Sequence, residues 1–202
     1  MYIQPAPFEP GILYHLYNHG NGDDNIFRCD ENYYYFLRKY KEYIYPIAET
    51  YAYNLMPNHF HFVLRIRNVD DLFDYFDISR NSHLNVYSNL LSRKFSNFFN
   101  GYTKAFNKMF DRTGKLFRSS VKRKRITDIN YLIRLIHYVH FNAVHHGFVN
   151  NMEDWEFSSY YDYNSRKENI IDFQQVLNWF EGVENFIGKH KEIPLFKIEF
   201  EY

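Results

Sequence analysis

The sequence predicts an α+β fold with a small antiparallel sheet, helices packed on one face of that sheet, and a C-terminal helical extension. Segments with strand-like and helix-like hydrophobic periodicity alternate along the chain. The glycine-rich turns that join strands to helices in nucleotide-binding parallel sheets are missing, which favours α+β over α/β. The chain has 202 residues, enough for one domain with appendages and a buried core.

The first half of the chain contains three expected strands and one helix. Residues 12–18 (ILYHLYN) are aromatic and branched and predict a strand that ends in a turn. Residues 31–48 carry apolar side chains at helical spacing after Asp30. Residues 51–55 and 59–66 predict two strands separated by a Met-Pro-Asn turn. In the second of these, Phe60, Phe62 and Leu64 point to one face, and His59, His61, Val63 and Arg65 point to the other.

The second half is richer in helices. Residues 67–82 are acidic and turn-rich, and residues 84–109 predict a long helix. Residues 121–126 (VKRKRI) are typical of an edge strand with outward charges. An amphipathic helix then begins at the N-cap Thr127 or Asp128 and extends to about Asn142. Beyond it we expect an aromatic loop, a helix at 173–180 and a short terminal strand.

Cysteine content and hydropathy restrict the class of protein. The single cysteine, Cys29, excludes a disulfide framework and a multi-cysteine zinc site. The N-terminal segment lacks the basic and apolar regions of a signal peptide. No segment approaches the roughly 18 consecutive apolar residues that a membrane span requires. We therefore expect a soluble protein of the cytoplasm, with no membrane partner.

A formal net charge of zero conceals an uneven charge distribution. Between Ser92 and Ile126 there are eleven basic residues and one acid, Asp111, whereas residues 150–202 carry eleven acids and five bases. A basic, aromatic-rich segment indicates a polyanionic partner such as a nucleic acid. A solvated helix face would explain the same charges, and both interpretations remain open on charge alone.

The His59-Phe60-His61 sequence is the sharpest candidate for a site. Histidines at alternate positions of a strand share one face, where their imidazoles can bind one divalent cation. Such a site leaves coordination positions open for oxygen ligands. Two half-exposed strand histidines without a ligand are the alternative interpretation.

The surroundings of these histidines resemble a known family. The segment LMPNHFHFVLR (residues 55–65) resembles the HUH motif of the single-tyrosine transposases, especially the REP-associated tyrosine transposases. Four further segments resemble motifs of the same family in the same order, namely residues 14–21, 114–122, 136–147 and 155–160. The resemblance covers roughly residues 12–163 and implies a ferredoxin-like or RRM-like sheet. We therefore expect a transposase domain at 1–163 and an extension at 164–202.

The resemblance also implies roles for individual residues. Tyr138 occupies the position of the nucleophilic tyrosine, and His59 and His61 occupy those of the metal ligands. Asn142, four residues after Tyr138 and on the same helix face, is the candidate third ligand. His140 is an alternative, although it points away from Tyr138. The implied cofactor is a divalent metal, Mg²⁺ or Mn²⁺. Ala143 departs from the family, which usually has proline at this position.

The implied activity is cleavage and rejoining of single-stranded DNA at hairpin-associated sites through a 5′-phosphotyrosine intermediate. The partner would be single-stranded DNA with a hairpin, and a homodimer is possible. Phe110 and Phe117 are candidate rings for stacking on bases. The expected DNA-binding residues are seven basic side chains and a turn: Arg112, Lys115, Arg118, Lys122, Arg123, Lys124, Arg125, Gly20 and Asn21.

Two other functions fit part of the pattern. A non-catalytic, RRM-like module that binds single-stranded nucleic acid explains the basic segment and the aromatics, but not the histidine pair or Tyr138. A metal-dependent phosphodiesterase would use water in place of tyrosine. Only the transposase hypothesis predicts a covalent bond between protein and DNA.

Overall fold

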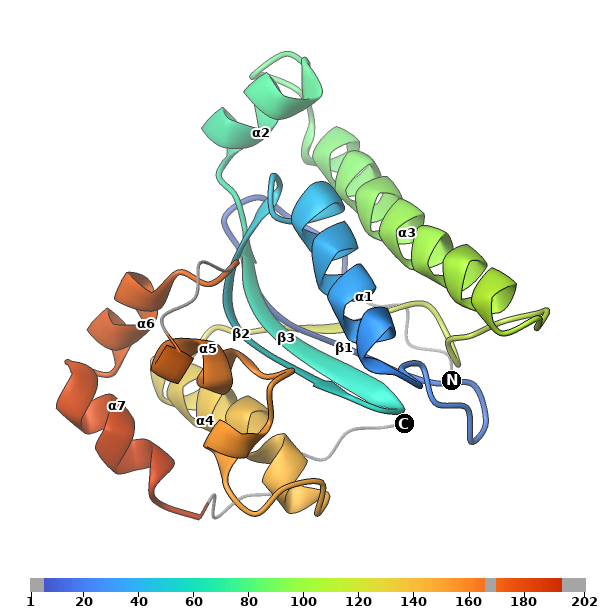
Figure 1. The fold of residues 1–202 in the computed structure, drawn as a ribbon. Coiled ribbons are helices and arrows are strands. Elements are labelled where there is room, and N and C mark those ends of the chain that lie inside the picture. The colour runs from blue at the N-terminus through green and yellow to red at the C-terminus, as the bar shows by residue number, and fades with distance from the viewer. Residues whose placement is uncertain (1–5, 166–169, 194–202) are drawn as a thin grey trace.

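The computed structural model describes residues 6–165 and 170–193 (Figure 1). These residues form four strands, seven α-helices and one short 3₁₀ helix, in the order β1 Leu13–His19, α1 Asp30–Tyr43, β2 Ala48–Met56, β3 His59–Ile66, α2 Val69–Phe76, α3 Leu84–Met109, β4 Lys122–Arg125, α4 Ile129–His145, η1 Met152–Asp154, α5 Ser159–Ser165, α6 Phe173–Trp179 and α7 Val183–His190. Within the described residues, the expected strands and long helices form, with shifts of a few residues at their ends.

The four strands form one antiparallel sheet in the order β2-β3-β1-β4. Strands β1 and β3 are therefore central, and β4 is an edge strand, as its charges predicted. Helix α1 connects β1 to β2, and α3 lies between β3 and β4, which is the arrangement of a ferredoxin-like sheet. The prediction of an α+β fold with a small antiparallel sheet is confirmed.

Helices α1 and α3 pack on one face of the sheet (Figure 1) and cover a core rich in aromatic rings. Phe60 and Phe62 are fully buried there. Tyr40 of α1 stacks on Phe62 with ring centroids 4.5 Å apart, and Phe99 of α3 stacks on Phe60 at 5.6 Å. The predicted alternation of β3 is confirmed, because Phe60, Phe62 and Leu64 all join this core. Burial of this apolar area is the main force that closes the sheet against the two helices.

The opposite face of the sheet is covered as well, by α4 (Figure 1). The prediction of helices on one face holds for α1 and α3, whereas α4 lies on the other face. Helix α4 covers this face because Tyr51, Ala52 and Val63 form an apolar surface there that water would otherwise contact. Leu135 and Val139 of α4 bury this surface and have no exposed area of their own.

The C-terminal segment packs against the same face and extends the second core. The cluster formed by α4 and β2 also contains Val176 of α6, Phe180, which directly follows α6, and Phe186 of α7. The backbone N–H of Asp172 donates to the Thr50 carbonyl at 2.9 Å. Helices α2 and α5 form where the sequence predicted turns and a loop, and α7 lies in the C-terminal extension that was expected to be helical. The expected terminal strand lies outside the described residues.

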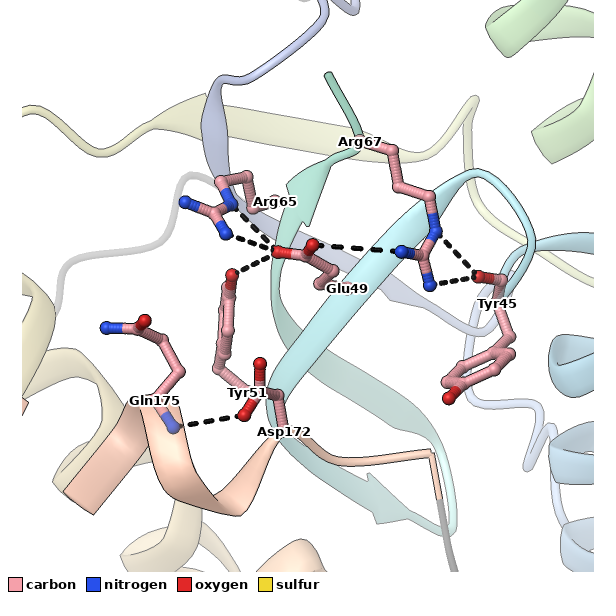
Figure 2. A network of polar contacts seen from close by, with 7 residues as sticks. All are labelled: Tyr45, Glu49, Tyr51, Arg65, Arg67, Asp172 and Gln175. Carbon is pink, nitrogen blue, oxygen red and sulfur yellow. Dashed lines mark hydrogen bonds and ion pairs between the residues drawn. The ribbon is translucent and has the colours of Figure 1, made fainter. Parts of the chain in front are cut away.

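One end of the β2–β3 pair is held by a cluster of charged and hydroxyl groups around Glu49 (Figure 2). Arg65 donates to Glu49 Oε2 through Nε at 2.9 Å and Nη2 at 2.6 Å, and the Tyr51 hydroxyl donates to the same oxygen at 2.7 Å. Arg67 pairs with Glu49 Oε1 at 3.7 Å and donates to the Tyr45 carbonyl. These contacts join β2 to β3 near the start of β2.

Among the described residues, no helix combines the length and the hydropathy that crossing a bilayer demands. The longest, α3, has 26 residues but carries charged side chains along its exposed side.

Asp128 caps the first turn of α4, and its removal provides a test of the helix start. Its side chain accepts a hydrogen bond from the Tyr131 backbone N–H at 2.6 Å. We expect Asp128→Ala to lower the free energy of unfolding by about 1 kcal/mol, whereas Asp128→Asn keeps an acceptor and most of the stability. Urea denaturation of both variants measures the difference. Equal stability of the two would contradict the capping role.

Candidate functional site

The register of β1 against β3 gathers histidines on the face covered by α4. His19 lies opposite His59, and Tyr17 lies opposite His61. Residues directly opposite in an antiparallel pair point to the same face, so His15, His19, His59 and His61 share one face. The rings of His59 and His61 lie 5.3 Å apart between centroids. The expectation that these two side chains lie next to one another is met.

His59 is held between a turn residue and α4. Its Nδ1 lies 2.7 Å from Asn58 Oδ1, in the turn that precedes β3. Its Nε2 lies 3.1 Å from Asn142 Oδ1, in the last turns of α4. A neutral imidazole carries one N–H, which can donate to only one of these two amide oxygens. The Asn142 side chain therefore lies against the ring nitrogen of His59 that faces α4.

His61 is held by β1 and faced by Tyr138. Its Nδ1 lies 3.1 Å from His15 Nε2. The Tyr138 ring meets the His61 ring edge-on, with centroids 6.0 Å apart. Tyr138 and Asn142 are one helical turn apart on α4, and each faces one histidine of the pair. The structure thus brings together all four residues that the sequence proposed for the metal and the nucleophile.

Three further histidines surround the pair, and the sequence prediction missed them. His15 contacts His61, His19 stacks nearly parallel on His59 at 5.7 Å, and His146 meets His59 at 5.0 Å between centroids. Strict alternation in residues 13–19 would have placed His15, Tyr17 and His19 on one face. No local pattern, however, showed that this face adjoins His59 and His61.

Burial keeps the imidazoles of His15, His59 and His61 uncharged at neutral pH. Loss of hydration lowers the pKa of His59 to about 3, although its hydrogen bond with Asn142 acts in the opposite direction. Burial likewise lowers the pKa of His15 to about 3 and that of His61 well below its usual value. The neutral imidazole is the form that coordinates a metal ion, so neither proposed ligand must first lose a proton.

Tyr138 is also largely buried, with 8% of its surface exposed. Burial raises the pKa of its phenol to about 12, and a hydrogen bond with Asn142 opposes that effect. The Tyr138 phenol of the folded protein is therefore protonated at neutral pH. A reaction at its oxygen requires a neighbouring positive charge or a strongly polarised partner.

His140, the alternative third ligand, points away from the pair. Its Nδ1 lies 2.8 Å from His190 Nε2 on α7, and its Nε2 lies 2.8 Å from Ser159 Oγ on α5. His190 Nδ1 in turn lies 2.7 Å from the Phe186 carbonyl. Both ring nitrogens of His140 therefore contact the C-terminal helices. Asn142 is the better candidate for the third metal ligand.

The donor set fits a divalent metal. The Nδ1 atoms of His59 and His61 contact Asn58 and His15, so Nε2 is the atom through which each ring would bind. With Asn142 Oδ1 this makes two nitrogens and one oxygen, a mixed set that first-row divalent ions accept. Among residues 6–165 and 170–193, no group of three or more His, Cys, Asp or Glu side chains is arranged to hold a metal.

The predicted basic residues fall into three groups. Lys122 and Lys124 of β4 lie opposite Tyr17 and His15, and therefore on the face of the histidine pair. Arg123 and Arg125 point to the other face. There Arg123 donates to the Ala6 carbonyl and covers the Phe8 ring at 4.0 Å, and Arg125 pairs with Glu9.

The third group lies around the loop between α3 and β4. Arg112 pairs with Asp24 at 2.6 Å, whereas Lys115 and Arg118 are exposed. Phe117 is only 8% exposed, which contradicts the expectation that its ring stacks on bases. A side chain at Gly20 would place its Cβ 2.1 Å from the Asp24 carbonyl oxygen, so internal packing already explains this glycine.

Comparisons with known proteins support the fold. No family model and no curated protein sequence matches the chain. Among solved structures, one of a REP-associated tyrosine transposase bound to a REP hairpin is similar, with a TM-score of 0.56 and 16% sequence identity. The match covers 86% of this chain and 94% of the other. At this identity the similarity establishes a transposase-like fold.

The buried histidines predict that acid destabilises the protein. His15, His59 and His190 have folded-state pKa values of about 3, against 6.5 for an unperturbed histidine. Below about pH 6.5 the unfolded chain therefore binds protons that the folded protein does not, and the free energy of unfolding falls as the pH falls. Urea denaturation at about pH 7 and about pH 5 tests this, in a range above most carboxyl titrations. His15→Gln should weaken the dependence on pH, and an unchanged slope would contradict the role of His15.

Proposed function

We propose that the protein is a transposase-type nuclease that cleaves and rejoins single-stranded DNA at hairpin-associated sites, with Tyr138 as its nucleophile. The observation that carries this proposal is the position of Tyr138 and Asn142 of α4 against His61 and His59 of β3. The similar solved structure supports it, because that transposase was solved with a hairpin bound. In this proposal residues 1–163 form the catalytic unit, and residues 164–202 form an extension.

In the proposed cleavage step, Tyr138 exchanges one phosphodiester for another. Its phenol releases its proton to water as the bond between Tyr138 Oη and phosphorus forms. The bond between phosphorus and the 3′ oxygen of the preceding nucleotide breaks. That oxygen takes a proton from water and leaves as a 3′-hydroxyl, while the 5′ side of the DNA stays attached to Tyr138.

His59 and His61 would hold the metal through Nε2, with Asn142 as a third ligand through Oδ1. A divalent ion bound there, Mg²⁺ or Mn²⁺, would supply Lewis acidity and orientation to the scissile phosphate. His15 and Asn58 orient the two imidazoles by their contacts with the Nδ1 atoms. Asn142 contacts both His59 and Tyr138, so it would hold the Tyr138 phenol in a defined position relative to His59.

Rejoining follows from the same chemistry. The phosphotyrosine bond conserves the energy of the cleaved phosphodiester, so a 3′-hydroxyl can attack it without ATP. A hydrolase that uses water loses this energy. The buried position of Tyr138 favours the covalent route, because the site limits the access of water to the linkage.

The alternative, a non-catalytic RRM-like module, has less structural support. RRM-like domains bind single-stranded nucleic acid on an open sheet face with exposed aromatic rings. Here α1 and α3 cover one face, and α4 covers the apolar part of the other. The histidines beneath α4 would also have no role in such a module.

The nucleophile is tested by Tyr138→Phe, which removes the hydroxyl and keeps the ring that packs on His61. Wild-type protein incubated with a labelled hairpin oligonucleotide and Mn²⁺ should form a denaturant-resistant adduct, seen on a denaturing gel, whose DNA-linked peptide contains Tyr138. The variant should fold and bind the oligonucleotide but form no adduct.

Tyr160→Phe is a suitable control, because it removes a hydroxyl from a half-buried tyrosine outside this site. It should form the adduct as the wild type does. An adduct that persists in Tyr138→Phe would refute this nucleophile, and binding without any adduct would favour the non-catalytic module.

The metal site is tested by His59→Ala, by His61→Ala and by EDTA. Each should reduce cleavage by at least about a hundredfold, because Lewis acidity at the phosphate contributes several kcal/mol to the rate. DNA binding should change little, and His145→Ala, an exposed residue at the end of α4, should cleave normally. Cleavage that survives EDTA would disprove the metal assignment.

A further inference from the structure

One row of paired residues crosses the sheet on the face of the histidine pair, and we call it the His61 row. Asn54 of β2 lies opposite His61 of β3, and His61 lies opposite Tyr17 of β1. Tyr17 lies in turn opposite Lys122 of the edge strand β4. Residues directly opposite in antiparallel strands point to the same face, so the four side chains stand on one side of the sheet. The row therefore leads from a buried amide to a basic residue at the edge.

Helix α4 covers the β2 half of the His61 row. The Val139 carbonyl of α4 accepts a hydrogen bond from Asn54 Nδ2 at 2.8 Å. The adjacent Tyr138 ring meets the His61 ring edge-on, with centroids 6.0 Å apart. Both Asn54 and His61 are buried. The nucleophile of the proposed reaction therefore approaches His61 from the side of α4 and β2.

The half of the row on β1 and β4 is more open. Tyr17 and Lys122 are each half-buried, so their side chains reach solvent. The outer edge of β2, by contrast, is covered by the chain itself, because the Leu55 backbone N–H donates to the Phe157 carbonyl at 3.0 Å. A strand whose phosphate is bound beside His61 therefore continues over β1 and β4.

The direction of attack determines where the leaving oxygen lies. In phosphoryl transfer the attacking and leaving oxygens stand roughly in line, on opposite sides of phosphorus. Because Tyr138 attacks from the side of β2, the 3′ oxygen that leaves faces β1 and β4. Neighbouring strands lie about 4.8 Å apart, which puts the backbone of Lys122 about 10 Å from that of His61. The flexible stem of Lys122 spans much of this distance and brings an ammonium, which only donates hydrogen bonds, towards the leaving oxygen.

Other groups on this face make contacts elsewhere. His15 is buried, and burial lowers its pKa to about 3, so it carries no extra proton to donate at neutral pH. His19 Nδ1 lies 3.0 Å from the Gly20 carbonyl, which takes the single N–H of a neutral ring. The Lys124 ammonium lies over the Tyr131 ring at 5.1 Å, beside the first turn of α4. Lys122 is therefore the candidate proton donor on the side of the leaving oxygen.

We infer that Lys122 donates a proton to the leaving 3′ oxygen while Tyr138 attacks the phosphate. The inference rests on the proposed function and puts this side chain in place of the water that donates the proton there. As the bond between Tyr138 Oη and phosphorus forms and the bond from phosphorus to the 3′ oxygen breaks, the proton moves from Lys122 Nζ to that oxygen. The products are a 3′-hydroxyl and a neutral Lys122 amine. In rejoining, the amine takes the proton of the attacking 3′-hydroxyl and becomes an ammonium again.

The test compares two substrates that differ in the leaving atom. The cleavage position is first mapped with wild-type protein, and a second oligonucleotide is then made with sulfur in place of the 3′ oxygen at that position. Thiols are far more acidic than alcohols, so the sulfur leaves as a thiolate and needs no proton donor. Cleavage of both substrates is measured with Mn²⁺ in single turnovers at saturating protein, which separates the rate of cleavage from binding.

Lys122→Ala should lower the cleavage rate of the oxygen substrate about a hundredfold and leave that of the sulfur substrate nearly unchanged. Lys122→Arg should show the same selective loss, because arginine keeps the positive charge but does not give up its proton. Lys124→Ala is the matched control, a lysine on the same strand and face. It should change both rates by the same factor, whatever its effect on binding.

Equal losses on the two substrates in Lys122→Ala would show a phosphate contact and would overturn the inference. A selective loss in Tyr17→Phe instead would assign the proton to the neighbouring phenol and overturn it as well. If wild-type protein forms no Tyr138 adduct, the proposed function fails and this inference fails with it. A Tyr138 adduct together with equal losses in Lys122→Ala refutes the inference alone.

A second measurement needs neither cleavage nor metal. Tyr138→Phe protein in EDTA is incubated with an oligonucleotide that ends at the mapped cleavage position in a periodate-oxidised ribonucleotide. The aldehydes at this 3′ end form an imine with a nearby amine, and cyanoborohydride reduces the imine to a stable bond. Peptide mapping should find the label on Lys122, and Lys122→Arg should abolish it. Labelling of a different lysine, with Lys122 unmodified, would contradict the placement of the leaving oxygen.

Discussion

The site depends on one buried hydrogen bond that seats α4 on the sheet. Asn54 of β2 is fully buried and lies opposite His61 in the β2–β3 register. Its Nδ2 donates to the Val139 carbonyl of α4 at 2.8 Å. A buried amide without a partner is costly, so the helix settles where this bond forms. That position places Tyr138 over His61 and Asn142 against His59.

The other side of α4 is held by the C-terminal segment. His190 Nδ1 donates to the Phe186 carbonyl, which leaves its Nε2 to accept from His140 Nδ1. His140 Nε2 then accepts from Ser159, whose oxygen receives the Tyr53 backbone N–H at 2.8 Å. This chain is complete with two neutral imidazoles. The helix with the candidate nucleophile is thus fixed from both sides by polar groups that have little freedom to rearrange.

The structure also separates the basic residues that hold other segments in place from those that lie beside the histidines. Arg112, Arg123 and Arg125 hold loops and the N-terminal segment through Asp24, the Ala6 carbonyl and Glu9. The lysines of β4 lie on the face of the histidines. A chain with no net charge can therefore be positively charged on both sides of one edge strand. Its acidic residues form internal ion pairs or lie in other parts of the sequence.

Local periodicity alone determined much of this protein. Alternation in β3 placed His59 and His61 on one face with Phe60 in the core, and helical spacing placed Tyr138 and Asn142 on one side of α4. Long-range pairing decided the rest: that β1 brings His15 and His19 to the pair, that α4 covers the second face, and that Phe117 is buried. Such contacts join residues far apart in sequence, and their free energy comes from burial and register across the whole sheet, which no local pattern contains.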